Sequence, residues 1–222
     1  MHDITLVIPA KSEADSLPKV LKELGKFSVK KIIVTQKDDI LTIKSIKKYK
    51  SKIIFQKKDG YGSALNQGIL SVKTKYFCIF NADGAFNPKY LKKMREKLKK
   101  DNDFIFNSRY GKNAGSDDDT VLTFIGNKIF TFICNTLFNL NISDVLFTYV
   151  MGSTRAYKSL DIVSRDFSFC VELPIKAKFM KYNMACLPSY ERPRIAGKKK
   201  VNEFKDGFLI LISIIRLFIF KK

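Results

Sequence analysis

Short apolar runs alternate with amphipathic segments through the first half of this chain, and this alternation limits the fold more than any other feature. The apolar runs predict strands at residues 4–8, 31–35, 52–56 and 76–80. The segments between them predict helices that open at Ser16 as a helix cap, cover residues 40–49 and follow the glycine-bearing segment 59–68. We therefore expect an α/β fold with a doubly wound, mostly parallel sheet and helices on both faces.

The loops that follow these strands should meet at one edge of the sheet, because right-handed crossovers bring the carboxyl ends of parallel strands together. Ligands of open α/β sheets bind at that edge. The loop at residues 81–84 reads Asn-Ala-Asp-Gly and directly follows the strand expected at residues 76–80. Its carboxylate, Asp83, is a candidate ligand-binding group, while the alternative is that Asp-Gly only makes the turn.

The glycine-bearing segment 59–68 matches neither the P-loop nor the dinucleotide-binding pattern. Small residues at a helix start, such as Gly62, can let backbone amides approach a phosphate. They can equally serve only to let the helix pack closely on the sheet. Both interpretations stay open at this point.

The formal net charge is +20 and the pI is ≈ 9.8, which favours polyanionic partners unless the lysines merely solvate the surface. The aromatic residues gather in apolar runs instead of alternating with arginine, so we expect no nucleic-acid partner. The polyanionic partner that we expect is an anionic membrane surface. The four cysteines lack metal-ligand spacing and the one histidine is His2, which argues against zinc and histidine catalysis. We expect reduced thiols, a cytoplasmic protein and no signal peptide.

Five motifs in order resemble one known family. They are Val7-Ile8-Pro9-Ala10 with Glu13; Gly60-Tyr61-Gly62-Ser63-Ala64 with Gly68; Asn81-Ala82-Asp83-Gly84; Ser108-Arg109-Tyr110; and Phe169 with Glu172-Leu173, then Arg194-Ile195-Ala196-Gly197-Lys198-Lys199-Lys200. Together they resemble the GT-A family 2 glycosyltransferases, and within them the dolichol-phosphate mannosyltransferase branch. The resemblance covers residues 4–207.

This resemblance implies an inverting, metal-dependent hexosyltransferase that moves a sugar from a nucleotide-diphosphate donor to a polyprenyl phosphate. The implied donor-binding residues are Pro9, Ala10, Glu13, Asp38, Gly62, Asn81, Ala82, Asp83, Arg194 and Lys200. Glu13 would lie at the nucleoside edge, and Arg194 and Lys200 would meet phosphate from a closing loop. The implied acceptor-binding residues are Arg109, Asn127 and Asp144, and the implied catalytic residues are Asp83, Arg109 and Arg194.

The same resemblance implies that Asp83 and Asn81 hold Mg²⁺ or Mn²⁺ on the donor diphosphate. Mg²⁺ commonly takes one or two carboxylates plus substrate phosphates, and cations stabilise the charge that develops on the leaving diphosphate. A phosphate acceptor is already anionic at neutral pH, so this reaction needs no general base.

Three departures from the family pattern leave alternatives open. Asn81 replaces a carboxylate, residues 35–38 lack the acidic Asp-Asp-Gly-Ser motif, and Lys199 replaces serine. One alternative is a degenerate member that binds a nucleotide sugar. Another is a transferase that acts on a sugar hydroxyl of a lipid-linked or surface glycan, with Asp144 or Glu172 as its base. If these two carboxylates serve only the fold, we expect Asp144 to cap a helix and Glu172 to pair with a lysine.

The second half contains a further strand expected at residues 104–106 and a loop at residues 115–119 that we expect to be mobile and solvated. Residues 121–140 then repeat apolar side chains at helical spacing. The stripe consists of Phe124, Ile125, Ile129, Phe132, Ile133 and Leu137. Core packing is the default for such a stripe, and an interfacial helix that dips into lipid is the competing interpretation.

The C-terminal residues 208–222 form an apolar helix with Arg216 inside it and two lysines at its end, and we separate them from a catalytic domain at residues 1–207. Thirteen apolar-rich residues cover roughly 20 Å, whereas a bilayer core is about 30 Å thick. We therefore expect a helix that lies at the interface of the cytoplasmic membrane face, with a membrane-protein partner as the other possibility. The protein would be peripheral.

Overall fold

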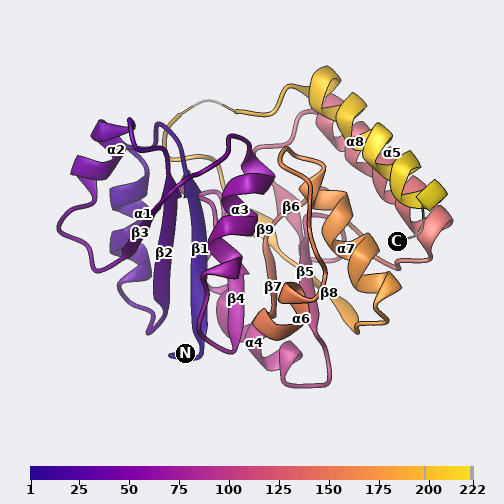
Figure 1. The fold of residues 1–222 in the computed structure, drawn as a ribbon, viewed down its shortest axis with the longest axis horizontal. Helices are drawn as coiled ribbons and strands as arrows, with labels where there is room; N and C mark the ends of the chain where they lie inside the picture. The colour runs from indigo at the N-terminus through magenta and orange to yellow at the C-terminus, as the bar shows by residue number, and fades with distance from the viewer. Residues whose placement is uncertain (198, 221–222) are drawn as a thin grey trace.

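The computed structural model describes residues 1–197 and 199–220. Lys198 of the basic motif and the two C-terminal lysines lie outside the described residues. The described part forms one mixed, mostly parallel sheet with helices packed on both faces (Figure 1), so the predicted α/β class is confirmed.

Seven strands make the main sheet in the order β3-β2-β1-β4-β7-β5-β8. They are β1 Ile4–Ala10, β2 Lys30–Thr35, β3 Lys52–Phe55, β4 Tyr76–Ile79, β5 Phe104–Ser108, β7 Val150–Ser153 and β8 Met184–Pro188. The pairs β1–β2, β1–β4, β2–β3 and β5–β8 are parallel, whereas β7 runs antiparallel to both β4 and β5. The first four strands lie where the apolar runs predict them.

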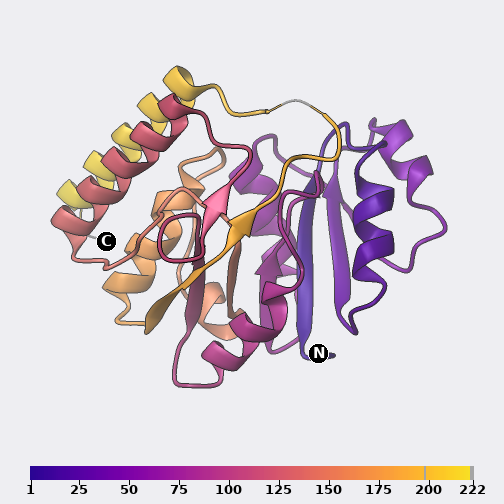
Figure 2. The same ribbon diagram turned by 180° about the vertical axis from the view of Figure 1, so that it is seen from behind.

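The helices are α1 Leu17–Leu24, α2 Ile40–Ser45, α3 Tyr61–Leu70, α4 Tyr90–Leu98, α5 Val121–Phe138, α6 Thr154–Lys158, α7 Phe169–Phe179 and α8 Glu203–Phe220. Two separate cores form on the two sheet faces because alternate strand residues point to opposite sides. Along β1, Leu6 and Ile8 join the core under α1 and α4, and Val7 joins the core under α3. Figures 1 and 2 show the two helical layers from opposite sides.

The glycines of α3 serve close packing. A Cβ at Gly68 would lie 2.4 Å from Val7 Cγ1, and one at Gly62 would lie 2.6 Å from the Asp166 backbone oxygen. Both helix positions therefore lie against the core or a neighbouring loop. The structure favours the packing interpretation for Gly62 over contact with a phosphate.

The segment at residues 115–119 belongs to a short sheet and its acidic side chains have protein partners, so the expectation of a solvated loop is wrong. Gly115–Ser116 forms β6 and pairs in parallel with β9, Tyr190–Glu191. Its acidic residues hydrogen-bond to Arg109, Arg194 and Tyr190. Arg109 lies 10 residues from Asp119, whereas Tyr190 and Arg194 lie 73 and 76 residues from their partners, so no local pattern could reveal the latter two.

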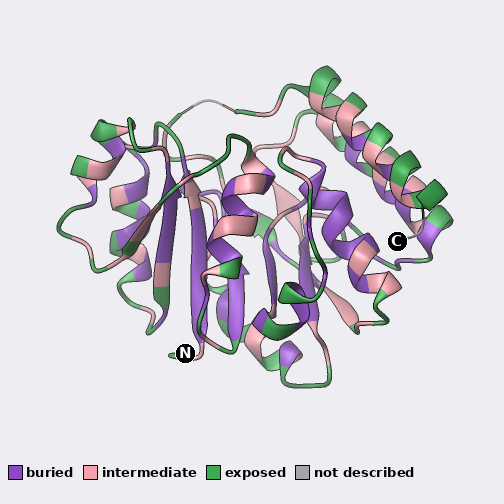
Figure 3. Cartoon of the chain, viewed as in Figure 1, coloured by how far each residue is buried: buried purple, intermediate pink, exposed green. Residues whose placement is uncertain are grey.

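Helices α5 and α8 lie side by side at one end of the molecule and expose much of their apolar surface (Figures 1–3). The core interpretation of the α5 stripe is wrong for most of its residues: Phe132 is 70% exposed and Ile129 is 52% exposed, whereas Ile133 is partly buried against the core. The side chains that α5 buries instead are Asn127, Thr131, Cys134 and Phe138. Of the described helices, α5 alone is long and apolar enough to cross a membrane by length and composition.

Helix α8 begins at Glu203, five residues before the start expected for an appended helix. It packs against α5 and α7, and Ile210 and Ile214 are buried in the core on that sheet face. The boundary expected after residue 207 therefore falls inside this helix. The opposite side of α8 is exposed, with Phe208 at 64% and Ile219 at 66%.

Candidate active site

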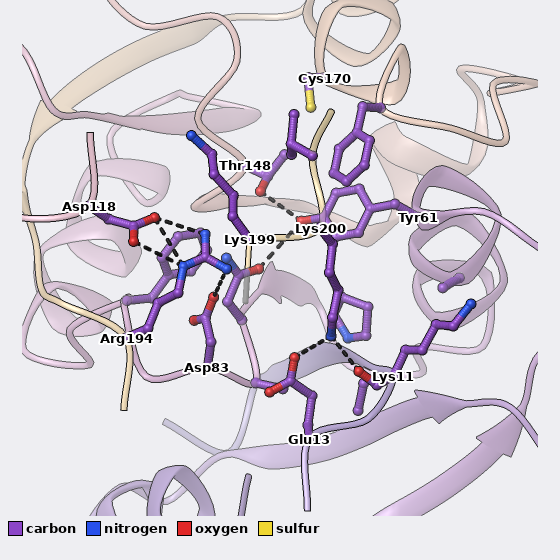
Figure 4. Close-up of a pocket in the computed structure, with 18 of the residues that line it drawn as sticks. Lys11, Glu13, Tyr61, Asp83, Asp118, Thr148, Cys170, Arg194, Lys199 and Lys200 are labelled. Atoms are coloured by element: carbon purple, nitrogen blue, oxygen red, sulfur yellow. Dashed lines mark hydrogen bonds and ion pairs between the residues drawn. The ribbon is translucent and has the colours of Figure 1, made fainter. Parts of the chain in front are cut away.

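A cavity of ≈ 320 Å³ opens at the carboxyl ends of β1, β2 and β4. Nine of the predicted site residues line it: Pro9, Ala10, Glu13, Asn81, Ala82, Asp83, Arg109, Arg194 and Lys200. Figure 4 shows that Glu13, Asp83, Arg194 and Lys200 come from segments at both ends of the chain and lie around one space. The expected convergence of the strand-end loops therefore occurs.

Asp83 lies at the base of this cavity, where the turn after β4 holds it. Its Oδ1 accepts a hydrogen bond from the Ala85 backbone N–H at 3.0 Å, and Gly84 adopts a φ of +86° that favours glycine. Its Oδ2 lies 3.6 Å from Arg194 Nη1. The same guanidinium binds Asp118 at 2.8 Å, so Arg194 bridges two carboxylates (Figure 4).

The donor set at Asp83 fits a divalent cation that arrives with its diphosphate. No group of three histidine, cysteine or acidic side chains with metal-binding geometry occurs among residues 1–197 and 199–220. Asp83 supplies one hard oxygen ligand, and the Asn81 amide oxygen next to it accepts a 3.4 Å hydrogen bond from Tyr61. One carboxylate plus substrate phosphates is a common Mg²⁺ environment, whereas one carboxylate alone is not.

Burial raises the pKa of the Asp83 carboxyl above the ordinary value of an aspartate, and the Glu13 and Asp118 carboxylates act in the same direction. The Ala85 N–H and Arg194 oppose this shift. The folded chain therefore binds this proton more tightly than the unfolded chain does. Above the raised pKa the ionised Asp83 costs stability, and the cost disappears as the pH falls through that pKa.

We accordingly expect Asp83→Asn to unfold at a higher temperature than the wild type at neutral pH when no donor or metal is present. The difference should shrink as the pH falls through the raised pKa toward the ordinary aspartate value of about 3.9, because the wild-type carboxyl then becomes neutral. Thermal unfolding of both proteins across this range, with a chelator added, measures it. A difference that stays constant with pH would contradict the raised pKa.

Glu13 and Lys200 lie at the opposite side of the cavity and contact each other. The Lys200 ammonium donates hydrogen bonds to Glu13 Oε1 and to the Lys11 backbone oxygen. Ser16 donates to Glu13 Oε2 at 2.5 Å and makes no side-chain hydrogen bond at the start of α1, so its expected role as a helix cap is wrong. The segment with Lys200 thus crosses above the end of β1.

Arg109 lines the cavity, but acidic side chains occupy its donors. Its Nε and Nη2 bind the two carboxylate oxygens of Asp144 at 2.8 and 2.9 Å, and Nη1 lies 3.1 Å from Asp119 and 3.6 Å from Glu191. The guanidinium also lies 4.8 Å from the Phe147 ring centroid. This arrangement holds the cavity wall in place. It leaves Arg109 poorly suited to the role that the resemblance implies for it, which is to bind an acceptor phosphate.

Four predicted site residues lie outside the cavity lining that the described residues form: Asp38, Gly62, Asn127 and Asp144. Asp38 is exposed, and its neighbour Asp39 caps α2. The Asn127 amide donates to Tyr110 Oη at 3.0 Å. Asp144 is fully buried against Arg109 and does not cap a helix.

Glu172 also serves the fold. It accepts hydrogen bonds from the Val163 and Ser164 backbone amides and pairs with Lys176 at 2.8 Å. The predicted lysine pairing is therefore confirmed. Glu172 faces a second cavity, between α7 and α8.

Sequence reasoning missed several residues that line the site. Tyr61 and Phe167 form a stacked aromatic wall with ring centroids 4.8 Å apart, and Tyr61 Oη lies 2.8 Å from Thr148 Oγ1. Glu191 is buried, accepts from Ser116 at 2.5 Å, and has a pKa raised by burial that Arg109 partly opposes. The one available signal was the acidic run at residues 117–119, which could have been matched to the arginine of the basic motif.

A strand-end carboxylate, basic side chains from the far end of the chain and a mixed α/β sheet together define a nucleotide-sugar transferase fold of the GT-A type. Residues 5–161 match the model of glycosyl transferase family 2. This match covers more than half of the chain, so the chain belongs to glycosyl transferase family 2.

Curated relatives and solved structures agree with this membership. An uncharacterized glycosyltransferase of Mycobacterium tuberculosis is 26% identical over 94% of this chain and 94% of its own length. A dolichyl-phosphate hexose transferase of Haloferax volcanii is 23% identical over 97% of this chain and 93% of its own length. The glucosyl-3-phosphoglycerate synthase of M. tuberculosis, solved with Mn²⁺, UDP-glucose and phosphoglyceric acid, has a TM-score of 0.74 at 13% identity, over 97% of this chain and 79% of that chain.

Mannosyl-3-phosphoglycerate synthase from Rubrobacter xylanophilus shares the fold as well. Its TM-score is 0.73 at 12% identity, over 96% of this chain and 72% of that chain. These structural likenesses confirm the GT-A-like architecture.

Proposed function

We propose that this glycosyltransferase moves a sugar, with inversion, from a nucleotide-diphosphate donor to a polyprenyl phosphate at the cytoplasmic face of the membrane. The observation that carries the proposal is a cavity built on Asp83 and Arg194 in a molecule that exposes the apolar faces of α5 and α8. The distant homology to a dolichyl-phosphate hexose transferase supports the acceptor class.

The donor diphosphate would lie between the strand-end loop and the basic segment. Asp83, with Asn81 beside it, would hold Mg²⁺ or Mn²⁺ on the diphosphate, and that cation would stabilise the charge on the leaving group. Arg194 would turn from its carboxylate partners toward the diphosphate, and Lys200 would contribute from the Glu13 side. Glucosyl-3-phosphoglycerate synthase, which shares the fold, binds UDP-glucose and Mn²⁺.

The transfer would be a single displacement. An acceptor phosphate oxygen forms the bond to the anomeric carbon while the bond from that carbon to the diphosphate oxygen breaks, and the leaving oxygen keeps the electron pair. No proton has to move, because the phosphate is already an anion. Since Asp144 and Asp119 occupy Arg109, the acceptor phosphate would meet the lysines of the cavity, Lys11 and Lys199.

A sugar hydroxyl as acceptor is the second candidate, and one observation favours it. Such a reaction needs a base, and Asp144 and Glu172 are both held away from the cavity. Glu191 lines the cavity, and burial raises its pKa toward the range of a useful general base. The assay must therefore include a variant of Glu191.

Transfer from a panel of nucleotide sugars to polyprenyl phosphate, and separately to glycan acceptors, tests the proposal. We expect product with polyprenyl phosphate, and we expect Glu191→Gln to stay within several-fold of the wild type because no base is needed. If the acceptor is a hydroxyl, the same variant should lose about 100-fold or more. Donor hydrolysis without transfer to either acceptor would contradict both candidates.

We expect the membrane location to depend on the exposed side of α8. Phe208→Glu with Ile215→Glu adds two charges to side chains that are 64% and 48% exposed, so the fold should persist while binding to vesicles is lost. The matched control is Leu41→Glu with Phe55→Glu, which makes the same change at 73% and 48% exposed positions on α2 and β3. Equal cosedimentation of the two double variants with anionic vesicles would contradict this role of α8.

A further inference from the structure

The second cavity, of ≈ 500 Å³, lies between α7 with the loop before it and one flank of α8. The α8 residues that line it are Leu209, Ile212, Ser213, Arg216, Leu217 and Phe220. Their spacing of three and four residues places them in one stripe along the helix. This flank is distinct from the buried side, which carries Ile210 and Ile214.

Arg216 is an unmatched charge in this stripe. It has no hydrogen bond or ion pair with any part of the chain that the structure describes, and the residues beside it on the helix, Ile215 and Leu217, are apolar. A charge set among apolar side chains is costly at a membrane unless an anion partners it. The residue thus favours a ligand that joins an anionic group to an apolar chain.

The other charged side chains around the cavity already have hydrogen-bond or ion-pair partners within the chain. Lys176 and Glu172 neutralise each other at 2.8 Å, and Glu172 also accepts two backbone hydrogen bonds. Asp166 uses Oδ1 to accept from the Ser168 backbone N–H at 2.8 Å. Among the described residues that line the cavity, Arg216 is therefore the cation available to a ligand, with the Ser213 hydroxyl one turn before it.

We propose that this cavity binds an anionic membrane phospholipid, with its phosphate at Arg216 and an acyl chain against Leu209, Leu217 and Phe220. The inference rests on the proposed membrane location and adds a specific lipid site to it. Long cationic side chains on an interfacial helix reach the headgroup level while their stems stay in apolar surroundings. The groove beside Arg216 then covers the first part of the acyl chain.

The chain contains no tryptophan, so Phe220→Trp places a single reporter in the cavity. Two vesicle preparations have the same mixture of phosphatidylglycerol and phosphatidylcholine, and they differ only in which of the two lipids carries brominated chains. Electrostatic attraction is then identical, and quenching reports which lipid lies beside the reporter. We expect brominated phosphatidylglycerol to be enriched there by about fivefold, the factor for one cation at a headgroup.

Arg216→Gln in the reporter protein should make quenching by the two vesicles equal, and Arg216→Lys should keep part of the difference. The matched control is Lys205→Gln, which removes the same charge from an exposed α8 position outside the cavity and should leave the difference unchanged. Asp166→Asn should increase it, because it removes the nearby anion. Far-ultraviolet circular dichroism checks that each variant folds.

Two failures can be told apart. If the reporter protein sediments with neither vesicle, the membrane location is wrong, and this site falls with it. If it sediments with both but quenching is equal in the wild-type cavity, or unequal after Arg216→Gln, the lipid site alone is wrong.

Discussion

Replacing Asp83 by alanine is expected to lower sugar transfer by about 100-fold or more, the loss typical of removing one preorganised group that stabilises a developing charge. Asp83 is the carboxylate next to Arg194 at the carboxyl end of β4, and it is 8% exposed. Because its ionised form is costly when buried, the fold should not suffer from the change. Initial rates with saturating donor and acceptor, together with the unfolding temperature, measure both effects.

Two further variants give this test its controls. Glu96→Gln removes a charge from an exposed position on α4 and should leave the rate within about twofold. Asn81→Asp restores a second carboxylate and should lower the Mn²⁺ or Mg²⁺ concentration needed for half-maximal rate. Near-normal turnover by Asp83→Ala, or no change in metal dependence for Asn81→Asp, would contradict the proposal that this loop binds a cation.

Arg109→Met is expected to destabilise the fold by about 3–5 kcal/mol, because it leaves a buried carboxylate without its partner. Asp144 is fully buried, and Arg109 supplies its two-pronged partner at 2.8 and 2.9 Å. For a chain of this size the loss corresponds to a fall of roughly 10 °C or more in the unfolding temperature. Denaturant unfolding of the purified variant measures it.

A surface pair of the same type provides the matched control. Arg95 binds Asp3 at 2.9 Å, but both side chains are 28% exposed, so Arg95→Met should cost about 1 kcal/mol or less. The double variant Arg109→Met with Asp144→Leu removes both buried charges and should recover much of the lost stability. If Arg109→Met costs no more than Arg95→Met, the Arg109 cluster does not hold the cavity wall.

The part of the fold that local pattern could reveal is the strand-and-helix alternation up to β4. Strands there are short apolar runs and helices are amphipathic, so each element carries its own signal, and the loop with Asp83 lies at the predicted sheet edge. The antiparallel strand β7, Val150–Ser153, carried no such signal, because its four residues gain their structure from β4 and β5 on either side.

The site residues also fall into those that the sequence motifs could identify and those that they could not. Motif order placed Glu13, Asp83, Arg194 and Lys200 in one cavity, as the structure has them. The resemblance assigned Arg109 to an acceptor phosphate, whereas the structure pairs it with carboxylates, and a guanidinium binds either with the same donor fork. The identity of its partner depends on which residues the fold brings near.

The amino-acid order alone thus specified an α/β sheet with a carboxylate at its ligand-binding edge, because these properties follow from hydrophobic period and from residues close together in the chain. It also specified two long apolar helices, one in the middle of the chain and one at its end. Three-dimensional packing determined that α5 turns its aromatic stripe outward, that the acidic segment at residues 117–119 meets Arg109 and Arg194, and that Arg216 is left beside an open groove. Most of these outcomes depend on contacts between residues far apart in sequence, and the free energy of such contacts is not encoded in any single segment.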